Sequence, residues 1–155
     1  MRRLLAIPAL ACALSLAVAT RALADAPTQI SGTYAVTSFQ VHSVTLVGTN
    51  VNIVVDESGT LGGDIQGDWF WQPDGISLGE DHVFLFGPSH GTFLCSPCTI
   101  GNRTGSFTAI EGSGASQPSI IFTITAANGG LAGLHGQLIS TGGAVGTYVG
   151  MISFR

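Results

Sequence analysis

The chain has 155 residues, which suits a single domain, and only 9% of them are charged, against roughly a quarter in an average soluble domain. Apolar residues make up 45% of the chain, so the composition excludes an intrinsically disordered protein. The formal net charge is −4 and no basic stretch follows the first three residues, so we expect no nucleic-acid partner.

Residues 1–24 have the pattern of a secretory signal peptide. Two arginines supply a positive charge near its start, residues 4–19 are almost wholly apolar, and Ala22 and Ala24 are small residues that suit a cleavage site. A membrane anchor is the rival interpretation, but the apolar stretch is shorter than the roughly 20 residues that span a bilayer. We therefore predict a periplasmic or secreted protein, with cleavage near Ala24 and one mature domain over residues 25–155.

The mature domain would be strongly acidic. It contains no lysine, keeps only Arg103 and Arg155 as positive side chains, and has nine aspartates and glutamates, which gives a formal charge of −7. Such a surface repels anionic lipids and phosphate backbones. We therefore predict that any ligand of this domain is not polyanionic.

From residue 25 onward the pattern is that of β-strands. No window of a dozen residues has apolar side chains at helical spacing, whereas short alternating runs follow one another between Gly, Asn, Asp and Pro. In the clearest run Ile65, Gly67, Trp69 and Trp71 share one face, and Asp-Gly, Asn-Gly and Gly-Gly pairs mark turns between runs. The predicted strands are 34–39, 41–56 with an interruption at 48–50, 64–71, 82–86, 91–95, 104–111, 119–126, 131–140 and 144–154.

Eight or nine strands without a helix leave two architectures, a sandwich or a closed barrel. Glycine inside a strand costs stability unless the sheet bends tightly or another segment approaches closely, and small barrels require both. We therefore predict an all-β fold, an eight-stranded antiparallel barrel. The glycines that favour it are Gly62, Gly63, Gly67, Gly105, Gly133, Gly136, Gly146 and Gly150.

Two glycine-rich segments carry a family resemblance. The sequence GNRTGSF at 101–107 resembles a G-x-R-x-G-S-F strand of bacterial allene-oxide-cyclase-like barrels, and GGLAGLHG at 129–136 is similar to their late G-x-L-x-G-L-x-G strand. An apolar strand at 120–124 lies between them, and a Gly-Asp-Ile-x-Gly run at 63–67 precedes them. Over residues 32–154 this order resembles an uncharacterised bacterial family in the superfamily of allene oxide cyclases and plant dirigent proteins.

The resemblance implies a calycin-like barrel with an apolar lumen. The characterised relatives bind a reactive apolar molecule and steer its cyclisation or coupling without a metal or an organic cofactor. We therefore expect no cofactor, no metal and a small apolar molecule as the partner. No catalytic residue carries over, because no position here matches a plant cyclase active site, and the Cys95–Cys98 insertion and the loop at 128–130 depart from the pattern.

The pair Cys95 and Cys98 predicts a disulfide, because an exported protein meets an oxidising compartment. Free or metal-binding thiols and a redox site are the alternatives. A redox site needs a helix that starts at the motif, which the following residues 99–102 do not favour. A structural zinc site needs a second pair of ligands, and no second C-x-x-C exists.

Few polar residues are candidates for chemistry in a lumen, and the weak catalytic candidates are Arg103, Glu111 and Tyr148. Arg103 either points into the barrel to hold a ligand carbonyl or carboxylate, or pairs with an acidic residue at a strand end. Asp64 and Asp68 are separated by about 13 Å along a strand, too far for a direct acid/base pair, so we assign them to a solvated outer face.

The aromatic residues at alternating positions are either ordinary core or the lining of a ligand cavity. The interior of an eight-stranded barrel is filled by side chains or holds one small ligand. If the lumen is open, the predicted ligand-binding residues are Trp69, Trp71, Phe107 and Phe122.

Three functions remain open after the sequence alone. The first is an exported barrel that binds a small apolar ligand, and the second is a cofactor-free cyclase or isomerase that uses the same cavity. The third is a structural or partner-binding barrel with a filled core, for which a homo-oligomer is possible. Stable membrane insertion is not expected, because outer-membrane strands need about 10 residues each and aromatic girdles at both interfaces.

Overall fold

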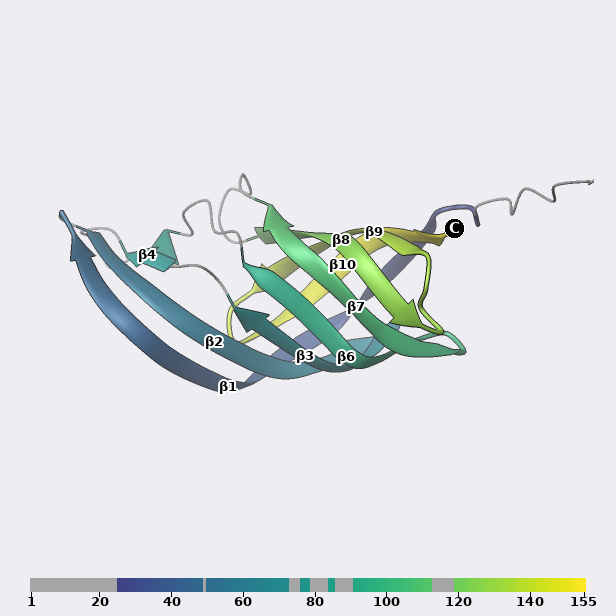
Figure 1. Cartoon of the computed structure of the whole chain (residues 1–155), viewed down its shortest axis with the longest axis horizontal. Helices are drawn as coiled ribbons and strands as arrows, with labels where there is room; N and C mark the ends of the chain where they lie inside the picture. Colours follow the sequence, from purple (N-terminus) through teal and green to yellow (C-terminus); the bar gives the residue numbers. More distant parts are fainter. Residues whose placement is uncertain (1–24, 49, 73–75, 79–83, 86–90, 113–118) are drawn as a thin grey trace, which may run out of the picture.

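The computed structural model describes residues 25–48, 50–72, 76–78, 84–85, 91–112 and 119–155, and this part of the chain is all β without a helix (Figure 1). The described residues therefore contain no helix that could cross a membrane. The predicted signal peptide, the Asp-Gly turn at 74–75 and most of the strand predicted at 82–86 lie outside the described residues. The strands are β1 Thr28–Val47, β2 Asn50–Gly63, β3 Ile65–Gln72, β4 Ile76–Leu78, β5 Phe84–Leu85, β6 Thr92–Ile100, β7 Arg103–Gly112, β8 Ser119–Gly129, β9 Leu134–Gly142 and β10 Val145–Phe154.

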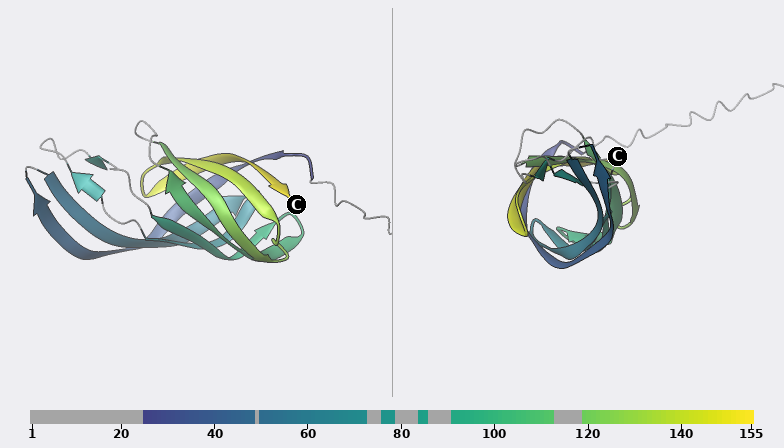
Figure 2. Two further views of the ribbon diagram at one scale, coloured as in Figure 1. Left: turned by 45° about the horizontal axis from the view of Figure 1, so that its top comes forward. Right: turned by 90° about the vertical axis from the view of Figure 1, so that its left-hand side faces the viewer.

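Eight of these strands close into an antiparallel barrel, as the sequence predicts. The order runs β1-β10-β9-β8-β7-β6-β3-β2, and β2 then pairs with β1 to complete the circle. Figure 2 shows this ring end-on in its right-hand view. Closure removes the open edges that an eight-stranded sheet would otherwise present.

Strands β1 and β2 are longer than the barrel wall needs, and their outer parts form a projecting hairpin. The first part of β1, 28–35, pairs with β10, whereas 36–47 pairs with β2 residues 50–59. We call residues 36–47 and 50–58 the arm; it extends beyond one end of the barrel (Figure 1). β4 pairs with the arm along Val51–Ile53, and β5 pairs with β4.

The prediction of separate strands at 34–39 and 41–56 is wrong, because β1 is continuous from Thr28 to Val47 and β2 starts only at Asn50. Two register shifts against β2 explain the difference, one between Val36 and Ser38 and one between Val41 and Ser43. Each shift adds one residue to β1 and reverses the phase of the alternation. A period-two pattern therefore breaks in the sequence although the strand does not.

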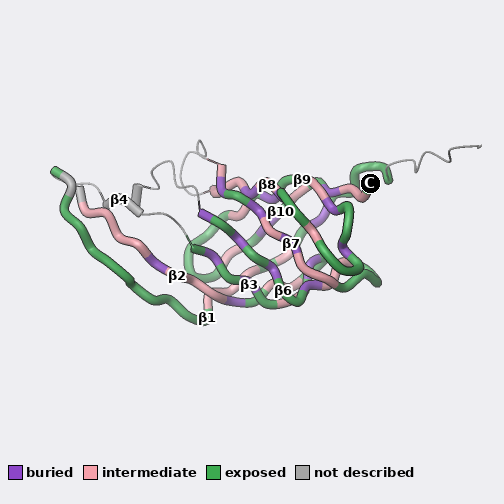
Figure 3. The backbone as a smooth tube through the Cα atoms, viewed as in Figure 1, coloured by how far each residue is buried: buried purple, intermediate pink, exposed green. Residues whose placement is uncertain are grey.

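The core lies inside the barrel and extends from the aromatic residues near the arm to the opposite end. In β3 the buried residues Ile65, Trp69 and Trp71 alternate with exposed ones, which confirms the face predicted for this strand. Figure 3 shows the same alternation along the neighbouring strands. At the far end Leu131, in the turn between β8 and β9, is completely buried and belongs to the core cluster.

Three strand glycines each lie beneath an aromatic ring on the neighbouring strand. Gly32 pairs with Tyr148, Gly59 with Trp69 and Gly146 with Tyr34, and in each pair the ring occupies the space that a Cβ atom would need. Such pairs let a large ring lie flat against a bent sheet. Of these three glycines, Gly146 is one at which we predicted that another segment approaches closely, and the ring of Tyr34 does so.

Cys95 and Cys98 are both buried in β6 and lie at disulfide-bonding distance, with Cα atoms 5.7 Å apart. Between them β6 contains one residue more than either neighbour, because Cys95 pairs with Phe107 and Cys98 with Gly105 on β7. The cysteine pair thus spans a bulge in the barrel wall. No active-site helix follows it, since residues 99–100 continue the strand.

Candidate functional site

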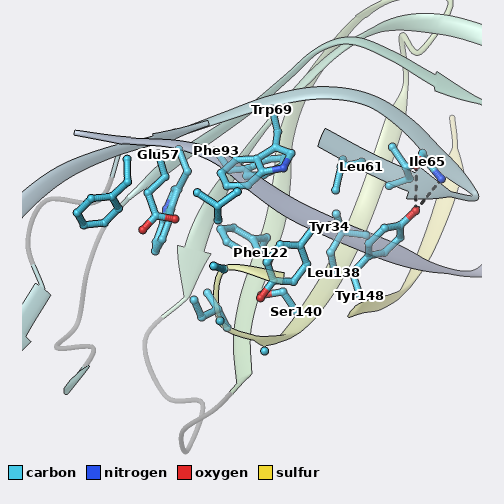
Figure 4. A pocket seen from close by; sticks show the side chains of 17 residues that line it. Tyr34, Glu57, Leu61, Ile65, Trp69, Phe93, Phe122, Leu138, Ser140 and Tyr148 are labelled. Carbon is cyan, nitrogen blue, oxygen red and sulfur yellow. Dashed lines mark hydrogen bonds between the residues drawn. The ribbon is translucent and has the colours of Figure 1, made fainter. Parts of the chain in front are cut away.

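The lumen contains a cavity of about 390 Å³ at the end of the barrel from which the arm projects (Figure 4). Its lining comes from β1, β2, β3, β6, β8, β9 and β10 and from the β9–β10 turn, so most of the barrel wall contributes. The lining residues are Tyr34, Val36, Phe39, Glu57, Leu61, Ile65, Trp69, Trp71, Phe93, Ile120, Phe122, Leu138, Ser140, Gly142, Gly143, Ala144 and Tyr148.

Aromatic rings in mutual contact form one side of this cavity. Trp69 stacks on Phe93 with ring centroids 5.8 Å apart, and Phe93 lies 5.2 Å from Phe122. The ring of Trp71 meets Phe122 edge to face at 6.1 Å, and Tyr34 meets Trp69 in the same way at 6.5 Å. Ring contacts of this kind hold each aromatic side chain in place, so the cavity wall is rigid and apolar.

The structure brings together three of the four residues predicted to line a ligand site. Trp69, Trp71 and Phe122 line the cavity, whereas Phe107 does not. Phe107 lies on the inward face as predicted, but it is only 1% exposed and packs against Phe93, with ring centroids 6.0 Å apart. Phe107 therefore packs against a residue of the aromatic wall without lining the cavity itself.

Tyr148, a predicted catalytic candidate, closes the inner end of the cavity and has its hydroxyl group fully engaged. The Ile65 N–H donates to Tyr148 Oη at 2.8 Å, and the hydroxyl lies 3.1 Å from the Ile65 carbonyl and 3.2 Å from the Gly62 carbonyl, to one of which it donates (Figure 4). Burial raises the pKa of Tyr148. The hydroxyl group of Tyr148 therefore has a structural role, because its hydrogen bonds link β10 to the backbone at the β2–β3 connection.

The polar groups of the cavity gather toward the arm. Glu57 lines the cavity, and its pKa is raised by burial and, secondarily, by the charge of Glu111. The pKa of Tyr34 is also raised, chiefly by burial and then by the charge of Glu57. The indole Nε1 of Trp71 is buried and has no hydrogen-bond partner in the described part of the chain. The cavity therefore offers a carboxyl group with a raised pKa, whereas the Trp71 Nε1 is buried beside the cavity.

Glu111, another candidate, is buried on the inward face of β7 opposite Phe122. It does not line the cavity, but it is near enough to influence Glu57. The charge of Glu111 therefore disfavours ionisation of Glu57, as a like charge in a shared apolar environment does.

Arg103 lies away from this cavity, at the opposite end of the barrel. Its side chain is 45% exposed, its guanidinium nitrogen lies 3.7 Å from the Asp25 carboxylate, and its guanidinium carbon lies 4.1 Å from the centroid of the Phe154 ring. A second cavity, of about 360 Å³, is lined there by Arg103, Asp25 and Phe154 among others. The structure thus places Arg103 at a strand end beside an acidic residue, apart from Glu57 and Tyr148.

Sequence reasoning missed Glu57, Tyr34, Phe93, Leu138 and Ser140 as lining residues. The signal for Glu57 is present but indirect, because it lies two residues before Gly59, which faces Trp69. Counting inward positions from that glycine places Glu57 in the lumen. Phe93 shares a face with Cys95 two residues later, and both are buried.

Among the described residues no group of three or more His, Cys, Asp or Glu side chains is arranged to hold a metal ion. Asp68 is exposed, and Asp64 is exposed and accepts a hydrogen bond from the Ser31 N–H at 2.7 Å. His42 and Asp56 on the arm approach to 2.5 Å. These acidic groups thus have structural partners or face solvent.

Comparison with protein-family models finds no match, and comparison with curated proteins finds none. Among solved structures the chain is similar to a protein of unknown function from the DUF3224 family of Shewanella oneidensis MR-1. The TM-score is 0.64 with 14% sequence identity, over 84% of this chain and 99% of that protein. The likeness supports the barrel fold. The allene-oxide-cyclase-like kinship finds no support in these comparisons and stays a hypothesis from the glycine motifs.

Proposed function

We propose that this protein binds a small, uncharged apolar molecule in the barrel lumen. The observation that carries the proposal is the cavity of about 390 Å³ with its wall of contacting aromatic rings. Ligand pockets are typically about 300–1,000 Å³, mostly apolar, with a few polar groups that fix orientation. The cavity has this size and composition, which a lumen filled by its own side chains would not have.

The charges around the cavity favour an uncharged ligand. Among the lining residues that the structure describes there is no arginine, lysine or histidine, and the acidic Glu57 and Glu111 are close to one another. A ligand carboxylate would meet no positive partner among these residues, and burying an unpaired charge is costly.

The test is a titration with N-phenyl-1-naphthylamine, a neutral fluorescent probe that brightens in apolar surroundings. Val36→Phe adds a ring inside the cavity, whereas the matched Val149→Phe adds it on the exposed outer face of β10. We expect saturable brightening with the wild type and with Val149→Phe, and at least tenfold weaker binding with Val36→Phe. Equal binding by all three proteins, or no binding by the wild type, would count against the proposal.

A cofactor-free isomerase or cyclase of the allene oxide cyclase or dirigent type is the second candidate. The glycine motifs favour it, and so does the carboxyl group of Glu57 inside an apolar cavity, since a raised pKa in a cleft is typical of acid/base residues. Glu57 is a better candidate for this role than Arg103, which lies at the other end. The test is the cyclisation of an unstable apolar epoxide: an excess of one product enantiomer that Glu57→Gln abolishes, with probe binding intact, would favour catalysis over binding alone.

We further propose that the mature protein is exported after cleavage near Ala24. The support is the charge and hydropathy pattern of residues 1–24. The first residue after the predicted cleavage site is already attached to the barrel, because the Asp25 N–H donates to the Phe154 carbonyl at 2.9 Å. The intact mass of the protein recovered from the periplasm or medium of its host would test this. A chain that retains residues 1–24 would contradict it.

A further inference from the structure

The arm has one apolar face and one polar face, although its sequence does not alternate regularly. Backbone partners in an antiparallel pair point to the same side of the sheet. Phe39 and Glu57 are partners and both line the cavity, so they define the inner face of the arm. Counting along the register from this pair, the remaining inner positions are Val41 with Val55, Val44 with Ile53, and Leu46 with Val51.

The two bulges of β1 keep this inner face apolar. Without the bulge between Val41 and Ser43, Val44 and Leu46 would fall on the opposite face from Phe39 and Val41, because their numbers have the opposite parity. The bulge between Val36 and Ser38 brings Val36 and Phe39 to the same face in the same way. The outer face carries polar residues instead, including Ser38, Gln40, Thr45, Asn52, Asp56 and Ser58. Above Glu57 the inner face of the arm contains no polar side chain among the paired residues of β1 and β2 from 39 to 55.

The β1 side of this apolar strip is exposed and is continuous with the cavity, whereas Val55 on its β2 side is buried. Val44 is 62% and Leu46 is 76% exposed, in contrast to the buried lumen residues (Figure 3). The strip begins at Phe39, which itself lines the cavity, and runs about 20 Å farther along the strand. Viewed end-on, the arm follows the curve of the barrel wall (Figure 2), so the strip prolongs the inner surface of the lumen.

We propose that the arm holds the extended hydrocarbon chain of a ligand whose other end lies in the lumen. The ligand class is therefore an uncharged long-chain molecule of lipid type. This inference rests on the proposed lumen binding and extends it from a compact to an elongated ligand. The chain would lie across Phe39, Val41, Val44 and Leu46 and cover apolar surface that is otherwise exposed to water.

Continuity with the cavity favours this occupant over a second copy of the protein. The strip prolongs the inward, concave side of the barrel wall, which accommodates a thin chain better than a neighbouring convex barrel. The outer face of the arm is mostly polar, with Val54 as an exception, so the continuous apolar strip lies on the side that leads into the lumen.

The experiment is a competition between the naphthylamine probe and uncharged 1-alkanols from eight to sixteen carbons. The arm variant is Val44→Ser with Leu46→Ser, and its matched control is Val54→Ser, the same chemical change on the outer face of β2. A fully buried methylene strengthens binding by about 0.8 kcal/mol, or roughly fourfold, and a half-covered one on the arm about twofold. The wild type and Val54→Ser should therefore gain about twofold per added carbon up to sixteen.

The arm variant should bind the probe and the shortest alkanols as the wild type does, but lose the gain for the longer ones. Equal chain-length dependence in the arm variant and the wild type would overturn the inference while leaving lumen binding intact. So would a dimer, seen by light scattering, that the arm variant converts to a monomer without any change in alkanol affinity. Failure of the wild type to bind the probe and every alkanol would instead remove the proposed function itself.

Discussion

Replacement of Tyr148 by phenylalanine isolates one buried hydrogen-bonded tie of the barrel. The substitution removes only the hydroxyl group and keeps the ring that lies over Gly32. That hydroxyl accepts a hydrogen bond from the Ile65 N–H at 2.8 Å, and both residues are buried. The variant therefore leaves a buried backbone donor without its partner while the apolar packing stays unchanged.

The expected cost follows from that single donor. An unsatisfied buried N–H costs about 1–3 kcal/mol, whereas the Gly62 and Ile65 carbonyls keep other opportunities for hydrogen bonds. We expect the free energy of unfolding to fall by about 2 kcal/mol. With an unfolding entropy of about 2 cal/mol/K per residue over the mature domain, this lowers the Tm by about 7 °C.

The assay is urea unfolding followed by tryptophan fluorescence, with Tyr34→Phe as the matched control. The Tyr34 hydroxyl has no hydrogen-bond partner within the described ranges, so its removal should change the free energy of unfolding by less than about 0.5 kcal/mol. If Tyr148→Phe were as stable as the wild type, or if both variants lost the same amount, the reasoning about Ile65 would be refuted.

Three further outcomes are expected. Glu57→Gln should stabilise the protein at neutral pH but not below pH 4.5, the usual pKa of the carboxyl group. Because the pKa of Glu57 is raised in the folded protein, the wild type loses stability as the pH rises through the folded-state pKa. Urea unfolding at several pH values measures this difference. Gly59→Ala should cost more than about 1–3 kcal/mol, because its Cβ would collide with a backbone carbonyl and the opposite tryptophan ring, whereas Gly143→Ala, with open space around it, should unfold at the same urea concentration as the wild type. Thiol titration of the denatured mature protein should find no reactive Cys95 or Cys98, and two reactive thiols would contradict the disulfide.

The barrel could be predicted because its strands follow local rules. The alternation of Ile65, Trp69 and Trp71 identifies an inward face, and it placed two tryptophans correctly in the lumen. Strand glycines indicated a closed, bent sheet, and one of them, Gly146, does lie beneath the ring of Tyr34 on the neighbouring strand. These features depend on one strand and its immediate neighbours, which is the range over which a sequence pattern carries information.

The arm and the polar end of the cavity could not be predicted in the same way. The bulges at residues 37 and 42 exist only relative to the register with β2, so the break in alternation reads as a strand end. Glu57 faces the lumen because of its pairing with Trp71, a contact between different strands. Arg103, the one arginine within a described strand, suggested a ligand-binding role because basic residues are rare in this domain. Its position at the first residue of β7 instead places it at the barrel end.

The long inner face of the arm has a consequence for stability as well as for binding. Val44 and Leu46 expose apolar surface, so covering them with an apolar ligand removes that surface from water and lowers the free energy. A ligand that binds only the folded protein raises its stability in proportion to the logarithm of its concentration. Long-chain alkanols should therefore raise the Tm more than short ones at equal concentration.

The most direct test of the central claim is a crystal structure of the mature protein under xenon pressure. Xenon occupies empty apolar cavities and is located by its strong scattering. The account predicts xenon within the lumen, in contact with Trp69, Phe122 and Leu138. A lumen without xenon, filled by the protein's own side chains, would contradict it.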